Sequence, residues 1–292
     1  MADVVLAAVP TPFAADGSLD LACARRLYEF LAGRADGLLV AGTTGEFPAL
    51  DEDERLVLID TAIDVLGPDR IIAHIGAPDA YRAVRLAREA SRLGASRIAA
   101  ITPYYLAASP AEVAEYYLRI RDAAPEPGLY AYIFPERTGL TVAPQQFCEL
   151  ADTVGLAGAK FSGVAARNVA ECAAALPGLR IFSGDDSDLA ATLRAGGAGI
   201  ISARTSAFPE VFSGLSAAIA AAVADPDAGA AVAARQADVS AIAGLGQSIG
   251  LVKEALRVRG FGPMTARMAV AEPDEATAAR VAELIKSLAL DG

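Results

Sequence analysis

The feature that most constrains this chain is a repeated alternation of short apolar runs with longer amphipathic segments. The runs have the length of β-strands, and the segments have the length and periodicity of α-helices. Eight such pairs occupy residues 1–224. The predicted strands are 4–9, 37–42, 70–76, 97–102, 128–134, 154–160, 179–184 and 198–203. The helices predicted after them are 19–33, 51–67, 79–94, 109–124, 143–152, 166–176, 185–197 and 208–224.

Strands that alternate with helices in this way pair in parallel through right-handed crossovers. An open doubly wound sheet and a closed barrel both satisfy that rule, and the number of units favours the α/β class of (β/α)8 TIM barrels. Three more helices are predicted at 228–245, 247–259 and 274–289. We therefore expect a barrel over residues 1–224 and a helical C-terminal extension over 225–292, packed on the barrel as one structural unit.

Composition excludes several classes of partner. The net charge is −11, whereas nucleic acids and anionic membranes are bound through clustered positive charge. No apolar run reaches the roughly 20 residues of a membrane helix, and the N-terminus lacks the basic start of a signal peptide. The cysteines at 23, 148 and 172 are odd in number and widely spaced, which indicates reduced thiols in the cytoplasm.

Lysine is unusually scarce, with three residues against 22 Arg. Lys160 ends a predicted strand, where TIM barrels carry their chemistry, whereas Lys253 and Lys286 lie in predicted helices and read as solvated side chains. Apolar surroundings disfavour a charged amine, and a neutral amine is what a Schiff base with a ketone requires. The alternative for Lys160 is a strand-end side chain that reaches solvent.

Other polar residues follow the remaining strands. Tyr132 could shuttle protons with a hydroxyl relay from Thr43 or Thr44, although it could equally pack, and Gly42–Gly45 could be only a tight turn. Arg137 could clamp a carboxylate or could be an ordinary loop residue. Helix capping explains at least one of Asp185 and Asp186. His74, the only histidine, reads as a core or near-site hydrogen-bonding residue, and a single histidine argues against a typical zinc or non-haem iron site.

The ordered set of motifs is more specific than any member. Along the chain come Gly42-Thr43-Thr44-Gly45-Glu46, Pro103-Tyr104-Tyr105, Tyr132 with Pro135 and Arg137-Thr138-Gly139, Gly158-Ala159-Lys160, and Ser183-Gly184-Asp185-Asp186. This set resembles the dihydrodipicolinate synthase / N-acetylneuraminate lyase family of pyruvate-dependent class I aldolases, and the similarity runs essentially from end to end.

The resemblance implies site residues and partners. Pyruvate would be held as a Schiff base on Lys160, with Tyr132 as the general acid–base residue. Thr43 and Thr44 would bind the pyruvate carboxylate, and Thr44 would also relay protons to Tyr132. The substrate pocket would further contain Arg137, Gly184 and the backbone of Ile201. Tyr105 would complete the relay from across a dimer interface, which implies a homotetramer built as a dimer of dimers. No metal or organic cofactor is implied.

Departures from the family pattern bear on the second substrate. Phe161 stands where the synthases usually have an acidic residue, and residues 204–206 lack the Asn common there. The positions that bind feedback lysine in many bacterial synthases are replaced, with Phe47, Pro48, Glu52, Pro78 and Arg82 nearby.

We therefore expect an aldolase or lyase that joins pyruvate to an aldehyde, or cleaves a 2-oxo acid such as a 2-keto-3-deoxy sugar acid. The alternatives are 4-hydroxy-tetrahydrodipicolinate synthase, which uses aspartate semialdehyde, a sugar-acid dehydratase of the same family, and a catalytically silent barrel that binds a small acid.

Overall fold

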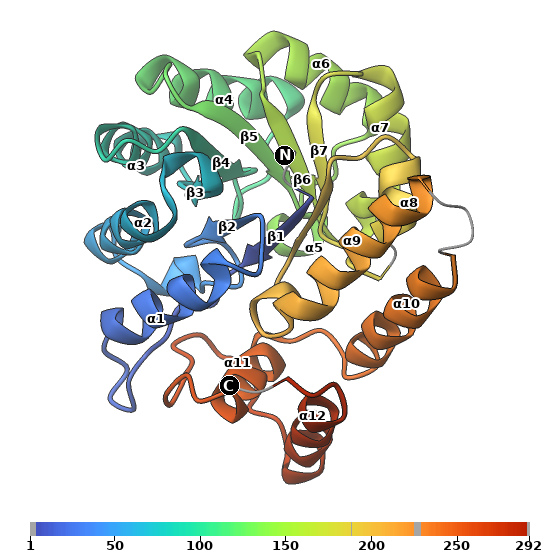
Figure 1. Ribbon diagram of the computed structural model, residues 1–292. Coiled ribbons are helices and arrows are strands. Elements are labelled where there is room, and N and C mark those ends of the chain that lie inside the picture. The colour runs from blue at the N-terminus through green and yellow to red at the C-terminus, as the bar shows by residue number, and fades with distance from the viewer. Residues whose placement is uncertain (1–3, 188, 225–228, 291–292) are drawn as a thin grey trace.

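The described part of the chain, residues 4–187, 189–224 and 229–290 of a computed structural model, contains eight parallel strands closed into a barrel. Each strand pairs with the next one in the sequence, and β8 pairs with β1. The predicted TIM barrel is confirmed (Figure 1). The strands are β1 (Val5–Ala8), β2 (Gly37–Val40), β3 (Ile71–His74), β4 (Arg97–Ile101), β5 (Gly128–Ile133), β6 (Gly158–Phe161), β7 (Arg180–Ser183) and β8 (Gly199–Ser202).

Helices surround the barrel as an outer ring (Figure 1). Ser109 caps α4 as predicted, because its side chain accepts a hydrogen bond from the backbone of Glu112, and Pro110 is the first helical residue. The ring consists of α1 (Leu21–Ala32), α2 (Glu52–Leu66), α3 (Ala80–Arg92), α4 (Pro110–Ala123), α6 (Pro144–Val154), α7 (Val169–Ala175), α8 (Leu189–Arg194) and α9 (Pro209–Ala224).

Three further helices follow the ring: α10 (Gly229–Ala243), α11 (Ile249–Val258) and α12 (Glu275–Ser287). Helix α10 packs along α9, and α11 contacts both α12 and the 3₁₀ turn Arg204–Ser206 that follows β8 (Figure 1). The predicted division at residues 224 and 225 adjoins residues 225–228, which lie outside the described residues, so that division stays a prediction.

Some predicted bounds were wrong. Strand β6 begins at Gly158 rather than 154, because α6 runs on to Val154 and ends at Gly155 in a left-handed conformation (φ 71°). It also ends one residue later, at Phe161. The short helix α5 (Pro135–Thr138) was not predicted. Helix α8 covers only part of 185–197, and Asp188 in that range lies outside the described residues.

Alternation of side chains along the strands creates two apolar layers. One side of each strand faces the helices, and the other side fills the barrel, where Tyr130 and Phe182 meet with ring centroids 6.5 Å apart. Gly158 pairs with Tyr130 across the β5–β6 ladder. A Cβ at Gly158 would lie 2.2 Å from the Tyr130 ring and 2.5 Å from the carbonyl oxygen of Arg180. Gly158 therefore makes room for the aromatic floor of the barrel.

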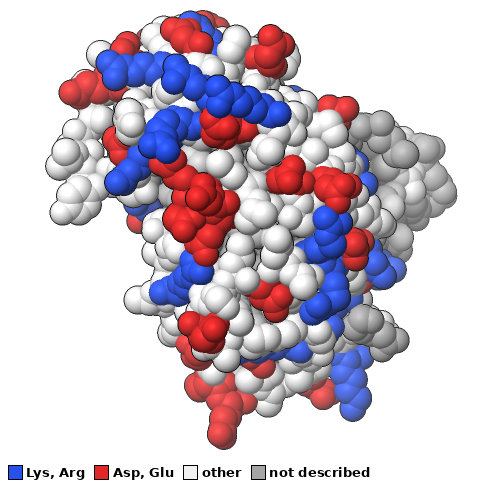
Figure 2. Space-filling view, turned by 90° about the vertical axis from the view of Figure 1, so that its left-hand side faces the viewer, with Lys and Arg blue, Asp and Glu red and all other residues white. Residues whose placement is uncertain are grey.

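Acidic and basic side chains are interspersed on the face shown in Figure 2, where Lys and Arg groups lie next to Asp and Glu groups. Together with the net charge of −11, this gives that face no continuous basic surface of the kind that binds nucleic acid. Within the described residues, none of the helices combines the length and the apolar character that crossing a membrane requires.

Gly158→Ala should destabilise the fold by about 1–3 kcal/mol, because the added methyl group meets a packed ring and a backbone carbonyl. Urea denaturation followed by circular dichroism measures the loss. Gly33→Ala is the matched control, since a Cβ there meets nothing within 4 Å. Equal midpoints for the two variants would contradict the packing described for Tyr130.

Candidate active site

Lys160 and Tyr132 are direct neighbours across the β5–β6 ladder. The Lys160 Nζ lies 4.6 Å from the centroid of the Tyr132 ring. Both side chains are buried, at 7% and 2% exposure. Since residues opposite each other in a parallel ladder point to the same side of the sheet, the register alone brings the amine and the phenol together.

The loop after β2 supplies two hydroxyl groups to the same place. The hydroxyls of Thr43 and Tyr132 form a hydrogen bond of 3.3 Å. Thr44 is buried and lines the same cavity. Within the described residues, Thr43 rather than Thr44 makes the contact with the phenol.

His74 lies behind this group in the barrel wall. Its Nδ1 is 3.0 Å from the carbonyl oxygen of Ala41, and its Nε2 accepts a hydrogen bond from the backbone of Ile101 at 3.3 Å. Its ring packs edge-on against Tyr132, with centroids 6.1 Å apart. Complete burial, and then the guanidinium of Arg55, hold the pKa of His74 well below its usual value. The sequence predicted a core or near-site hydrogen-bonding role for His74, and a buried, neutral imidazole with these hydrogen bonds agrees with that prediction.

A buried ion pair fixes the end of the threonine loop. Glu46 and Lys253 are both almost fully buried and hydrogen-bonded to each other. Lys253 also donates to the carbonyl oxygen of Thr265 at 2.7 Å, and Glu46 accepts from the backbone of Arg267 at 2.9 Å. The interpretation of Lys253 as a solvated side chain was therefore wrong, because the buried Glu46 carboxylate offsets the cost of burying its charge. Lys286 is exposed, as expected.

One cavity of about 370 Å³ joins these groups to the C-terminal helices. Its lining near the lysine includes Thr43, Thr44, Tyr132, Lys160 and Ile201. The cavity then extends past β8 to the segment between α10 and α11. That volume lies in the range of small-molecule sites.

The structure brings three more predicted residues to the cavity. Ile201 lines it from β8 and is buried, whereas Arg137 lies exposed at its rim, with the guanidinium 5.5 Å from the Phe134 ring centroid. Gly184 lies against Ser162, and a Cβ at position 184 would come 2.1 Å from the Ser162 hydroxyl. Glycine at this position therefore lets β7 approach β6 closely at the cavity wall.

Tyr105 is the predicted site residue that does not line the cavity. Its side chain is 93% exposed, and its backbone has a positive φ of 80°. Leu106 beside it is 77% exposed. A strained backbone that holds two large apolar side chains in solvent is unusual in a free surface loop.

Of the two residues that follow Lys160, the sequence pointed to Phe161, but the structure places Ser162 in the cavity lining instead. Phe161 points away from the cavity and packs edge-on against Phe147 of α6, with centroids 4.8 Å apart. It cannot select the second substrate by direct contact. Ser162, which sequence reasoning passed over, does line the cavity. Its position two residues after Lys160 was the available signal, since alternate strand residues share a face.

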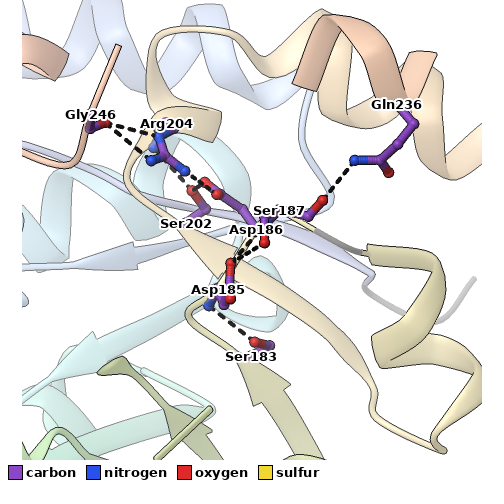
Figure 3. A network of polar contacts seen from close by, with 8 residues as sticks. All are labelled: Ser183, Asp185, Asp186, Ser187, Ser202, Arg204, Gln236 and Gly246. Atoms are coloured by element: carbon purple, nitrogen blue, oxygen red, sulfur yellow. Dashed lines mark hydrogen bonds and ion pairs between the residues drawn. The ribbon is translucent and has the colours of Figure 1, made fainter. Parts of the chain in front are cut away.

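Asp186 and Arg204 form a second buried ion pair in the cavity wall (Figure 3). Asp186 also accepts a hydrogen bond from the hydroxyl of Ser202. Burial raises the pKa of Asp186, and the guanidinium opposes that shift. Helix capping therefore does not explain Asp186. Asp185 remains exposed and accepts from the backbone of Ser187 at 3.0 Å. Arg204 was not predicted as a site residue, because its partner is remote in sequence.

Within the described residues, no group of three or more His, Cys, Asp or Glu side chains is arranged to hold a metal ion. The arrangement instead offers an amine, a phenol and hydroxyl groups at one end of a cavity, and a guanidinium at its rim. Such a set can form an imine and move protons next to it.

Comparison with known proteins gives one consistent result. The model of the dihydrodipicolinate synthetase family matches residues 1–288. The 4-hydroxy-tetrahydrodipicolinate synthase of Acidothermus cellulolyticus is 31% identical over 295 residues, which cover 99% of this chain and 92% of that protein. The synthase of Caldicellulosiruptor bescii is 35% identical over 205 residues, which cover 70% and 69% of the two chains.

Among solved structures, the chain is similar to YagE, a prophage protein of the dihydrodipicolinic acid synthase family from E. coli K12, in complex with pyruvate. The TM-score is 0.86 at 28% sequence identity, over 99% of both chains.

His74→Gln should flatten the pH dependence of stability between about pH 6.5 and 5.5. The unfolded chain takes up a proton near 6.5, whereas burial keeps the folded imidazole neutral to much lower pH. Wild-type stability should therefore fall as the pH drops, by up to about 1.4 kcal/mol per unit.

Urea denaturation of wild type and variant at pH 7.5, 6.5 and 5.5 measures this difference. Because the chain has a single His, other histidines do not contribute. Parallel pH profiles would show that His74 titrates alike in the folded and unfolded states.

Proposed function

Because this chain belongs to the dihydrodipicolinate synthetase family, we propose that it is a lyase of the class I aldolase type that joins pyruvate reversibly to an aldehyde. The observation that supports the proposal most is the position of Lys160. Its amine lies 4.6 Å from the Tyr132 ring centroid, inside a cavity large enough for a substrate beyond pyruvate.

The proposed reaction begins when the Lys160 amine adds to C2 of pyruvate and water leaves, which gives a protonated imine. The imine withdraws electrons from C3, so a proton leaves C3 and an enamine forms. The enamine carbon attacks the aldehyde carbon, and the aldehyde oxygen takes up a proton. Hydrolysis of the imine releases the 2-oxo acid and restores the lysine. Cleavage follows the same steps in reverse.

Tyr132 is the proposed proton carrier for these steps, because its phenol lies beside the lysine and is hydrogen-bonded to Thr43. Thr43 and Thr44 are proposed to hold the pyruvate carboxylate through their hydroxyls and loop backbone. In this scheme Ile201 lines the pyruvate pocket from β8, and Gly184 and Ser162, which lie in close contact, form the cavity wall beside the second substrate.

A specific observation also favours 4-hydroxy-tetrahydrodipicolinate synthase as a second candidate. Arg137 lies at the cavity rim, and it forms no ion pair within the described residues. A free guanidinium can bind a carboxylate through two parallel hydrogen bonds, as an aldehyde such as aspartate semialdehyde would require. Relatives at 31% and 35% identity carry this activity in their names.

Tyr105 is proposed to act from a neighbouring subunit. Its exposure of 93%, beside the exposed Leu106, fits a segment that becomes buried on self-association. The proposed assembly is a dimer of dimers in which Tyr105 of one subunit reaches the phenol of Tyr132 in the other.

The proposed compartment is the cytoplasm. The three cysteines are free thiols, and Cys148 and Cys172 contact each other without a disulfide bond. A reducing environment maintains such a pair.

Incubation with pyruvate and borohydride should add one reduced pyruvate to the protein, at Lys160, because borohydride traps the imine as a stable amine. Peptide mass spectrometry locates the adduct. Lys160→Arg should abolish it, whereas Lys286→Arg, which changes an exposed lysine, should leave it intact. An unmodified Lys160 in the wild-type protein would overturn the proposal.

A substrate panel then separates the candidate reactions. Condensation of pyruvate with aspartate semialdehyde supports the synthase. Release of pyruvate from 2-keto-3-deoxy sugar acids supports the lyase, and loss of water without pyruvate release supports a dehydratase.

Mixing one strongly impaired variant with one inactive variant tests the role of Tyr105. Tyr105→Phe should lower kcat by about 10²-fold, as expected for the loss of a proton-transfer group, and Lys160→Ala should be inactive. A mixed dimer has one site with Lys160 from one subunit and Tyr105 from the other. Equal amounts, refolded or expressed together, should therefore recover about a quarter of the wild-type activity. No recovery in confirmed mixed dimers would show that Tyr105 does not act across the interface.

A further inference from the structure

The loop that carries Thr43 and Thr44 contains two backbone donors beside the cavity. Within the described residues, the N–H groups of Thr43 and Thr44 donate no hydrogen bond. Consecutive N–H groups in a turn bind anions such as a carboxylate. They can do so only while the loop keeps its shape, so the contacts that hold the loop decide how well the carboxylate of a 2-oxo acid is bound.

Two residues with a left-handed backbone bound this loop. Ala41 before it has a φ of 54°, and Glu46 at its end has a φ of 55°. Such conformations are uncommon for residues other than glycine, and they persist only where the surroundings hold them. The backbone N–H of Glu46 donates to the carbonyl oxygen of Thr43 at 3.0 Å. The backbone of Glu46 is therefore part of the turn that presents the two N–H groups.

The side chain of Glu46 is anchored by α11 and by the segment that follows it. Its carboxylate is fully buried and accepts hydrogen bonds from the Nζ of Lys253. It also accepts from the backbone N–H groups of Arg267 and Met268, at 2.9 and 2.8 Å. Lys253 lies in α11, and the other two residues lie between α11 and α12. The shape of the threonine loop therefore depends on a part of the chain that follows the eight strand–helix units.

The anchor itself is held from two more sides. The Nζ of Lys253 donates to the carbonyl oxygen of Thr265 at 2.7 Å. The guanidinium of Arg267 binds both carboxylate oxygens of Glu54 in α2, each at 2.6 Å. Because the segment after α11 is fixed to α2 in this way, it can hold Glu46 in one position.

We propose that Glu46 and Lys253 are positioning residues for the carboxylate of the 2-oxo acid. Lys253 and the segment after α11 hold Glu46, and Glu46 holds the turn that aims the N–H groups of Thr43 and Thr44. Neither Glu46 nor Lys253 lines the cavity, so both act through the loop. The inference rests on the proposed function, and it adds that residues after the barrel set the affinity for pyruvate.

Reductive trapping at Lys160 tests the inference with two ketones, pyruvate and methyl pyruvate, which has no carboxylate. Lys253→Met should raise the pyruvate concentration that gives half the maximal trapping rate about 10- to 100-fold, since hydrogen bonds to the carboxylate weaken. The maximal rate with pyruvate, and the rate with methyl pyruvate, should stay close to those of wild type. Peptide mass spectrometry after cyanoborohydride reduction measures both adducts.

A double variant keeps the test decisive if Lys253→Met fails to fold, because that variant leaves the Glu46 carboxylate unpaired in the core. Glu46→Leu combined with Lys253→Met leaves no charge at either position, and it should fold and show the same selective loss for pyruvate. Arg257→Met is the matched control, because Arg257 lies one turn after Lys253 in α11 and pairs with Glu254 and Glu272. It should trap both ketones as wild type does.

An equal loss with pyruvate and methyl pyruvate would overturn the inference, because it would show that the ion pair only supports the fold. Unchanged half-saturation by pyruvate in a folded variant would contradict it too, as would equal trapping of the two ketones by the wild-type protein. Absence of any pyruvate adduct on wild-type Lys160 is a different failure, since the proposed function falls with it.

Discussion

The register between β5 and β6 is the constraint on which the rest of the site depends. It places Tyr132 directly opposite Lys160, and one layer below it places Tyr130 opposite Gly158. A shift by one residue would turn Lys160 toward the helix layer and Phe161 into the cavity. Gly158 has no side chain, and this leaves space for the Tyr130 ring. The same register therefore sets both the packing of the barrel floor and the alignment of Lys160 with Tyr132.

Two buried ion pairs hold the loops around Lys160 and Tyr132. Glu46 and Lys253 join the threonine loop to α11, and Asp186 and Arg204 join the ends of β7 and β8 to the segment before α11. Breaking a buried pair by removing one partner is costly, because the remaining charge is left unpaired. The C-terminal helices thus contribute directly to the geometry of the cavity.

The sequence was sufficient for the barrel, because eight apolar runs alternate with amphipathic helices and parallel strands admit few topologies. It also pointed to Lys160 and Tyr132, since both end strands whose carboxyl ends meet. It was insufficient for Arg204, whose partners Asp186 and Gly246 are distant along the chain and become neighbours only through the fold. Lys253 was misjudged for the same reason: a helical pattern shows amphipathicity, but it cannot show that Glu46 lies opposite. Phe161 was misjudged because the end of β6 was placed one residue early, which hid its outward orientation.

The central claim is that Lys160 forms a covalent bond to pyruvate between Tyr132 and the two threonines. A crystal structure of the protein soaked with pyruvate tests it most directly. The account predicts continuous electron density from the Lys160 Nζ to C2 of the ligand, with the carboxylate at Thr43 and Thr44. A pyruvate molecule bound in the cavity without a bond to Lys160, or bound elsewhere, would contradict it.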